Sequence, residues 1–454
     1  KLTRGGYRPK QKENLFGAWA WKCSIKNSAS QGKLSGKKIA IKDNVAVAGI
    51  PLTDGSSLLK DFIPTVDATI ISRIIDAGGE IAGKSVCENL CVSSGSHTSY
   101  PSPVKNPRNP AFMAGGSSSG SAALLATGEV DMAIGGDQAG SIRMPAAWCG
   151  VLGLKPTHGL VPYSGILGMD PYIDHVGPMA NSSEDLALLL EVIAGRDGMD
   201  PRQLNTPFEL PRYSESLGKG IKELRIGIVN EGFGWENLSE KDVDEMVREK
   251  GFALEKSGAT VSEISIPEHR DAVHIWSGIA LEGAWYHMIR ANGLEHQWAG
   301  EFDLALLERW SKAFKAFGNK LPETAKLVSV VANYMAEKYS GRYYGLARNL
   351  RQWLIKIYDE ALASVDILLM PTTPQKPPPF EKNMSLKRSL EISMGNFQNT
   401  CAFDVSGHPA LSVPCGTLAG LPVGMMLVGR YFEESTLLRV SAYLEKMNEN
   451  VPVN

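Results

Sequence analysis

The sequence Gly-Gly-Ser-Ser-Ser-Gly-Ser at residues 115–121 is a run of serines between glycines, followed at once by the small apolar residues 122–126. A glycine and serine run by itself is typical of a solvated linker. The apolar continuation, which ends at Gly128, instead predicts a packed helix of small residues over 120–127. The serines therefore stand at the entrance of a buried helix.

Two further segments flank this run at a distance. Upstream, Lys42 lies in Lys-Ile-Ala-Ile-Lys-Asp-Asn at 38–44, where apolar residues surround a lysine that would normally favour water. Downstream, Gly-Gly-Asp-Gln-Ala-Gly-Ser-Ile-Arg-Met-Pro occupies 135–145 and contains Ser141. Ser117 thus follows Lys42 by 75 positions and precedes Ser141 by 24.

This combination of motifs and spacings resembles the amidase signature family, and it is similar to free-standing bacterial amidases that act on aliphatic and aromatic amides. Segments 149–157, 174–179 and 403–410 are also similar to that family, so the resemblance runs from about residue 15 to about 446. It implies a hydrolase acting on amide C–N bonds without cofactor or metal. It also implies an α/β fold of the amidase-signature type, a mixed β-sheet core covered by helices on both faces.

The resemblance also implies a catalytic triad, and the chemistry of the residues agrees with it. A serine hydroxyl needs a base to attack a carbonyl, and lysine can be that base only when it is neutral, a form that burial favours. We therefore expect Ser141 to attack, Ser117 to relay the proton and Lys42 to receive it. In the family the peptide bond before the bridging serine is cis, which implies a cis bond between Gly116 and Ser117.

The loop that leads into a helix at 142–149 is expected to stabilise the developing oxyanion through backbone N–H groups. The expected oxyanion hole comprises Gln138, Ala139, Gly140 and Ser141. The expected supporting residues are Ser118, by a hydrogen bond to Lys42, and Asp137 and Arg143, by orienting the loop.

Apolar and aromatic residues are expected to form the acyl pocket, which favours a hydrophobic acyl or aryl substrate over a charged one. The predicted substrate-binding residues are Cys91, Tyr172, Ile173, Met394 and Phe397, with Trp276 and Phe403 nearby. The family usually has glycine at the position of Ala139. Because alanine tolerates fewer backbone conformations, we expect a stiffer loop and a slightly narrower pocket here. Small acyl anilides are the expected substrates, and aryl carbamates (urethanes) are a second class.

Composition agrees with an enzyme that acts on a small molecule. A net charge of −2 provides no field for nucleic acid or an anionic membrane, and no stretch has the ~18 apolar residues of a membrane span. The six cysteines form no C-x-x-C pair, and the eight histidines show no metal-ligand spacing. We expect reduced thiols, no metal and a cytoplasmic location. The expected binding partner is a small amide or carbamate, and a homodimer is possible.

The order of predicted elements divides the chain into three segments of what we expect to be one large domain. Residues 1–205 alternate strands (38–41, 80–83, 132–135) with helices (66–77, 120–127, 186–194) and form the amidase core. Residues 206–364 begin with a strand at 224–229 and continue, over 271–363, as a helical insert or lid. Residues 365–454 return to the core with strands at 365–370, 410–413 and 422–428.

Two other functions fit parts of the pattern. Relatives in the family serve as glutaminase-like subunits of a tRNA-dependent amidotransferase, but those usually carry threonine and glutamine where Gln138 and Met144 stand. The segment 116–120 also satisfies G-x-S-x-G, which would make Ser118 the nucleophile of an α/β-hydrolase esterase. That motif requires a strand directly before it, whereas residues 106–110 have the composition of a turn.

Overall fold

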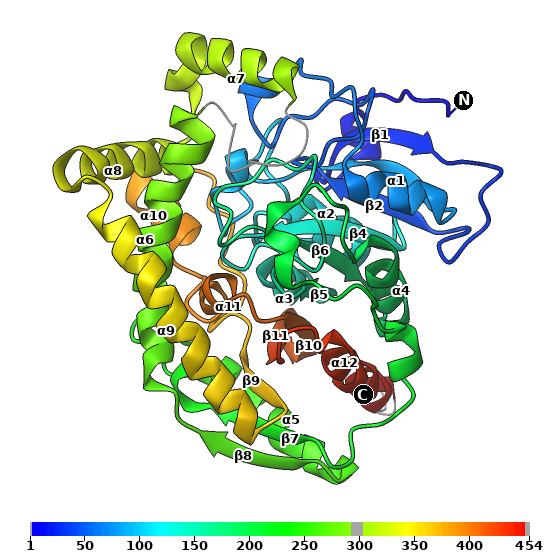
Figure 1. Ribbon diagram of the computed structural model, residues 1–454, viewed down its shortest axis with the longest axis vertical. Helices are drawn as coiled ribbons and strands as arrows, with labels where there is room; N and C mark the ends of the chain where they lie inside the picture. Colours follow the sequence, from blue (N-terminus) through cyan, green and yellow to red (C-terminus); the bar gives the residue numbers. More distant parts are fainter. Residues whose placement is uncertain (1, 292–302, 450–454) are drawn as a thin grey trace.

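A mixed sheet runs through the centre of the protein, which is described here by a computed structural model over residues 2–291 and 303–449 (Figure 1). Its eleven described strands follow the order β1-β3-β2-β4-β6-β5-β10-β11-β9-β7-β8. The strands are β1 (Trp19–Ile25), β2 (Lys38–Lys42), β3 (Glu80–Ser85), β4 (Met132–Asp137), β5 (Leu152–Lys155), β6 (His175–Ala180), β7 (Arg225–Val229), β8 (Thr260–Ile264), β9 (Ile367–Pro371), β10 (Ala410–Leu418) and β11 (Leu421–Val428).

In the described chain, helices pack against this sheet or against other helices. They are α1 (Thr69–Asp76), α2 (Ser119–Ala126), α3 (Arg143–Cys149), α4 (Ser183–Ile193), α5 (Lys241–Ala253), α6 (Ala272–Ala284), α7 (Leu304–Phe317), α8 (Glu323–Tyr339), α9 (Arg342–Ser364), α10 (Leu386–Met394), α11 (Cys401–Ser406) and α12 (Glu434–Glu449).

The two faces of the sheet bury different side chains because successive residues of a strand point to opposite sides. Ile39 and Ile41 of β2 pack in one core together with the isoleucines of α1 and the leucines of α4. Ala40 of β2 and Ala133 of β4 pack in a second core with the small residues of α2. Both faces are therefore covered by helices, and the predicted α/β fold class is confirmed.

The same alternation places Lys42. It is the last residue of β2 and shares the parity of Ala40, so its side chain belongs on the face that α2 covers. β2 runs parallel to both β3 and β4, with Lys42 paired with Ser85 and Ile41 paired with Ile134. The carboxyl ends of these strands consequently lie together beneath the start of α2.

Most predicted elements are present, with ends shifted by a few residues. Strand 410–413 extends to Leu418, and helix 66–77 is shortened to Thr69–Asp76. The sequence analysis missed β1, β5, β6 and β8. β6 contains Gly177 and Pro178, which are unfavourable in strands, and β5 has only four residues, so neither gives a clear alternating pattern.

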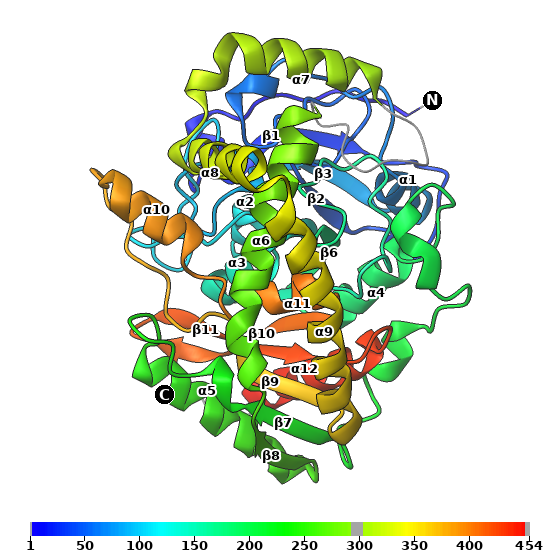
Figure 2. The ribbon, with the colours of Figure 1, turned by 60° about the vertical axis from the view of Figure 1, so that its left-hand side comes forward.

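The helical insert is present as α6 to α9, although the part of the prediction over 292–302 lies outside the described residues. Figure 2 shows α6 and α9 crossing the molecule side by side in front of α11. Trp276, Ala280 and Leu281 of α6 line a cavity in the core, together with Val328 of α8. Among the described residues, no helix combines the length and apolar character needed to cross a bilayer.

Candidate active site

Lys42 and Ser117 form a fully buried pair. The Lys42 Nζ donates to Ser117 Oγ at 2.8 Å and to the carbonyl oxygen of Gly136 at 3.0 Å. The bond between Gly116 and Ser117 is cis, as the resemblance implied. A Cβ on Gly116 would lie 2.2 Å from the Gly95 oxygen, so only glycine fits at this close approach of two segments.

Ser118 stabilises the end of β4 and has no direct hydrogen bond to Lys42 among the recorded contacts of the described residues. Its hydroxyl donates to the Gly136 oxygen at 3.1 Å and accepts from the Gly136 N–H at 3.2 Å. The expected hydrogen bond from Ser118 to Lys42 is replaced by a shared acceptor, because both side chains donate to the Gly136 carbonyl oxygen. No strand directly precedes Ser118 in the described chain, since β3 ends at Ser85 and only isolated bridges follow.

Asp137 organises the loop that carries Ser141. Its carboxylate accepts hydrogen bonds from the N–H groups of Gly140 and Ile142, and Asp137 Oδ2 lies 2.9 Å from the Nε of Arg143. Burial opposes ionisation of Asp137, but the charge of Arg143 holds its pKa below the usual range. Arg143 also pairs with Asp404 at 2.6 Å, a carboxyl whose pKa is raised by burial and by repulsion from Asp137. Asp137 and Arg143, which were expected to orient the loop, thus belong to one buried network that includes two of its N–H groups.

The loop 138–141 exposes some of its N–H groups and not others. The indole Nε1 of Trp276 donates to the Gln138 carbonyl at 2.6 Å, and the Thr400 hydroxyl donates to the Ala139 carbonyl. Within the described residues, no acceptor is recorded for the N–H groups of Gln138, Ala139 and Ser141. The Gly140 N–H, which was expected in the oxyanion hole, is instead bound to Asp137.

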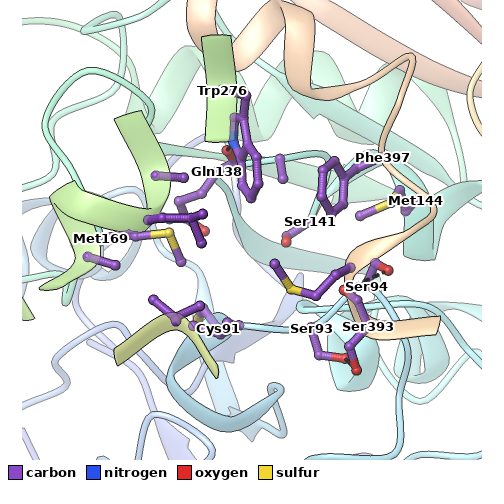
Figure 3. A pocket seen from close by; sticks show the side chains of 17 residues that line it. Cys91, Ser93, Ser94, Gln138, Ser141, Met144, Met169, Trp276, Ser393 and Phe397 are labelled. Atoms are coloured by element: carbon purple, nitrogen blue, oxygen red, sulfur yellow. Dashed lines mark hydrogen bonds between the residues drawn. The ribbon is translucent and has the colours of Figure 1, made fainter. Parts of the chain in front are cut away.

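A cavity with about 460 Å³ of empty space opens beside Ser141, whose side chain is directed into it (Figure 3). Seventeen residues line it, with no Asp, Glu, Lys, Arg or His among them: Cys91, Val92, Ser93, Ser94, Gln138, Ala139, Ser141, Met144, Met169, Trp276, Ala280, Leu281, Ala284, Val328, Ser393, Met394 and Phe397. The rings of Trp276 and Phe397 contact each other with centroids 4.5 Å apart. The cavity has the size and apolar character of a small-molecule site.

The structure brings Cys91, Met394 and Phe397 together in this lining, but not Tyr172 or Ile173. The ring of Tyr172 stacks under the Arg348 guanidinium at 3.8 Å, and Ile173 is fully buried in the core. Sequence reasoning missed Met144 and Met169. Met144 follows Ser141 by three residues, so a helix starting there would have indicated that it faces the same space.

Comparisons with known proteins identify the family of the chain. The model of the Amidase family matches residues 11–438. The chain is 42% identical over 449 residues to an enantioselective amidase of Rhodococcus rhodochrous, covering 98% of this chain and 86% of that one. The structure of a glutamyl-tRNA(Gln) amidotransferase subunit from Thermotoga maritima superimposes with a TM-score of 0.77 at 28% identity, covering 95% of this chain and 88% of that chain. The peptide amidase of Stenotrophomonas maltophilia gives a TM-score of 0.74 at 28% identity, with coverage of 92% and 84%.

These matches define the protein as a hydrolase that acts on amide C–N bonds. The chain belongs to the amidase signature family, and the resemblance inferred from its motifs is confirmed.

Proposed function

We propose that the protein hydrolyses small, uncharged amides, with anilides as preferred substrates and aryl carbamates as a second class, through a Ser-Ser-Lys mechanism. The observation that carries this proposal is the position of Ser141 at a largely apolar cavity, beside the N–H groups of Ala139 and Ser141, for which no acceptor is recorded among the described residues. Lys42, whose Nζ lies 2.8 Å from Ser117 Oγ, is the proposed base.

In the proposed first step, Ser141 Oγ forms a bond to the substrate carbonyl carbon and gives its proton to Ser117, whose own proton passes to Lys42. The carbonyl oxygen becomes an oxyanion, which the N–H groups of Ala139 and Ser141 stabilise. Loss of one such donor typically costs about 3 to 4 kcal/mol.

The C–N bond then breaks. The proton held by Lys42 returns through Ser117 to the leaving nitrogen, which is a poor leaving group unless it is protonated. Water attacks the acyl-enzyme by the same relay and releases the acid. With a carbamate substrate the intermediate is an alkoxycarbonyl-enzyme, and its slower deacylation would give a burst of arylamine.

A glutaminase-like role is the alternative, because one structural relative is an amidotransferase subunit. Glutamine carries an α-ammonium and an α-carboxylate, and burying either charge without a partner is costly. The described cavity lining contains no Asp, Glu, Lys or Arg to pair with both of them. This favours uncharged amides.

The test is a comparison of kcat/KM for acetanilide, an aryl carbamate, short aliphatic amides and glutamine, using the purified chain alone. We expect acetanilide to be the best of these, the carbamate to be hydrolysed and glutamine to be at least ~100-fold poorer, which corresponds to ~2.7 kcal/mol. Good turnover of glutamine with inert anilides and carbamates would contradict the proposal.

A further inference from the structure

Asp54, Cys87 and Cys91 bring three metal-ligating groups together next to the Lys42 and Ser117 pair. The Cys91 Sγ lies 3.3 Å from Asp54 Oδ1, and the Cys87 Sγ lies 3.8 Å from the same oxygen. All three ligand atoms lie within 4.8 Å of one another, and no other such group occurs in the described chain. Asp54 and Cys87 are buried, while Cys91 lines the cavity with 9% of its surface exposed.

The backbone holds this cluster in place. Asp54, Leu90 and Cys91 have φ values of 48°, 52° and 59°, in the left-handed region that residues other than glycine rarely adopt. The Leu90 N–H donates to the backbone carbonyl of Asp54 at 2.9 Å, which ties the two segments together. Non-glycine residues in this region tend to gather at functional sites.

The spacing fits a tetrahedral ion. Bonds of about 2.3 Å to sulfur and about 2.0 to 2.2 Å to oxygen place tetrahedral ligands roughly 3.5 Å apart. The two recorded sulfur–oxygen distances bracket that value. Two sulfurs with one carboxylate form a donor set that suits Zn²⁺ and other thiophilic ions.

The charges of the cluster agree with this donor set. Burial raises the pKa of Asp54 and of Cys87, while the hydrogen bond from Cys87, aided by Lys42 and by a hydrogen bond from Ser117, lowers the pKa of Cys91. The adjacent Asp43 carboxylate is paired with Lys84 at 3.0 Å. The Asp43 charge is thus already neutralised, which leaves Asp54 as the carboxylate of the cluster.

We propose that Asp54, Cys87 and Cys91 form a binding site for a thiophilic divalent cation such as Zn²⁺ or Cd²⁺, and that its occupation inhibits the enzyme. The ion would bind the Cys91 sulfur, which lies close enough to Lys42 and Ser117 for both to act on its charge. It would also place positive charge near Lys42, which opposes protonation of that base during attack. The inhibition rests on the proposed relay, whereas the binding site does not.

The test uses Cd²⁺ as the probe, followed by its thiolate charge-transfer absorption in the absence of substrate. We expect the wild-type chain, reduced with a phosphine, to bind one equivalent of Cd²⁺ and to lose at least about tenfold in activity, with recovery after EDTA. Cys87→Ser should weaken binding at least about 100-fold, and each variant's inhibition is scored against its own activity without metal. Cys149→Ser, another buried cysteine, should behave as wild type.

Two further variants keep each part of the proposal testable. Asp54→Asn replaces Cys87→Ser if the latter fails to fold, and it should also weaken binding. Ser141→Ala should retain the Cd²⁺ band whether or not it retains activity, so a failure of the proposed function is distinguishable. Absence of the band, or a band unchanged by Cys87→Ser and Asp54→Asn, would overturn the site. Binding of Cd²⁺ at the site without loss of activity would overturn the inhibition.

Discussion

Lys42 is completely buried, yet its nitrogen has two oxygen partners, Ser117 Oγ and the Gly136 carbonyl. A buried polar nitrogen without partners would cost about 1 to 3 kcal/mol, so these contacts make burial tolerable. The 2.8 Å contact with Ser117 is also short enough for proton transfer in either direction.

If Lys42 and Ser117 serve one relay, the effects of their substitutions on the activation free energy must not add. We expect Lys42→Ala and Ser117→Ala each to lower kcat by at least about 10³-fold, and the double variant to lose little more than the worse single variant. Ser121→Ala is the matched control, since Ser121 lies in the same serine run but donates to the Ile134 carbonyl. Steady-state kinetics of the four variants measures this, and losses that add in free energy would contradict a shared relay.

At this scale the motifs predicted that Lys42 and Ser117 lie together, whereas tertiary packing decides which side chains line the cavity. Lys42, Ser117 and Asp137 could be predicted because each occupies a fixed place in a local pattern. Tyr172 could not be placed, because an aromatic residue gives the same signal whether it lines a cavity or stacks on Arg348. The engagement of the Gly140 N–H by Asp137 is a matter of loop geometry that no spacing reveals.

Among the elements, α6 links the helical insert to the loop 138–141. It carries Trp276, whose Nε1 donates to the Gln138 carbonyl at 2.6 Å while its ring contacts Phe397. The sequence predicted a helical region over 271–363, because helical periodicity is a strong signal in long segments. It could not predict which turn of which helix reaches the loop, since that depends on how α6 crosses α9 and α11.

Removing the indole donor should disturb the loop more than the cavity. We expect Trp276→Phe to lower kcat/KM roughly tenfold, the equivalent of one lost hydrogen bond of ~1.4 kcal/mol. Trp310→Phe is the control, because the Nε1 of this buried tryptophan of α7 has no hydrogen-bond partner among residues 2–291 and 303–449. Equal effects of the two substitutions on kcat/KM would indicate that only packing matters at Trp276.

Across the whole molecule, strands from all three predicted segments of the chain share one sheet. β5 and β10 are paired at its centre, where Ala410 lies opposite Lys155. Lys155 is fully buried and donates to the Pro156 carbonyl at 3.1 Å. Burial lowers the pKa of Lys155 to about 7, although the charge of Asp404 opposes that change.

The stability of the fold should depend on pH through this lysine. The pKa of Lys155 is lower in the folded state than the ~10.4 of an unfolded chain, so the unfolded chain binds the proton more readily. The free energy of unfolding is therefore highest above pH ~10.4 and decreases as the pH falls to about 7. Between pH 6 and 9 it should raise the free energy of unfolding by ~3 kcal/mol. Lys155→Met should remove this rise, and the exposed Lys241→Met should keep it, as measured by urea unfolding at both pH values. An unchanged slope in Lys155→Met would contradict the assignment.

The central claim, that Ser141 is the acylated nucleophile, is tested most directly by locating a covalent adduct. The chain is treated with a fluorophosphonate, and the modified residue is identified by intact-mass and peptide mass spectrometry. We predict a single adduct on Ser141, which is absent in a folded Ser141→Ala variant that has also lost nearly all activity. An adduct on Ser118 would instead support the α/β-hydrolase arrangement, an adduct on Cys91 would assign attack to the cavity thiol, and either result would contradict the account.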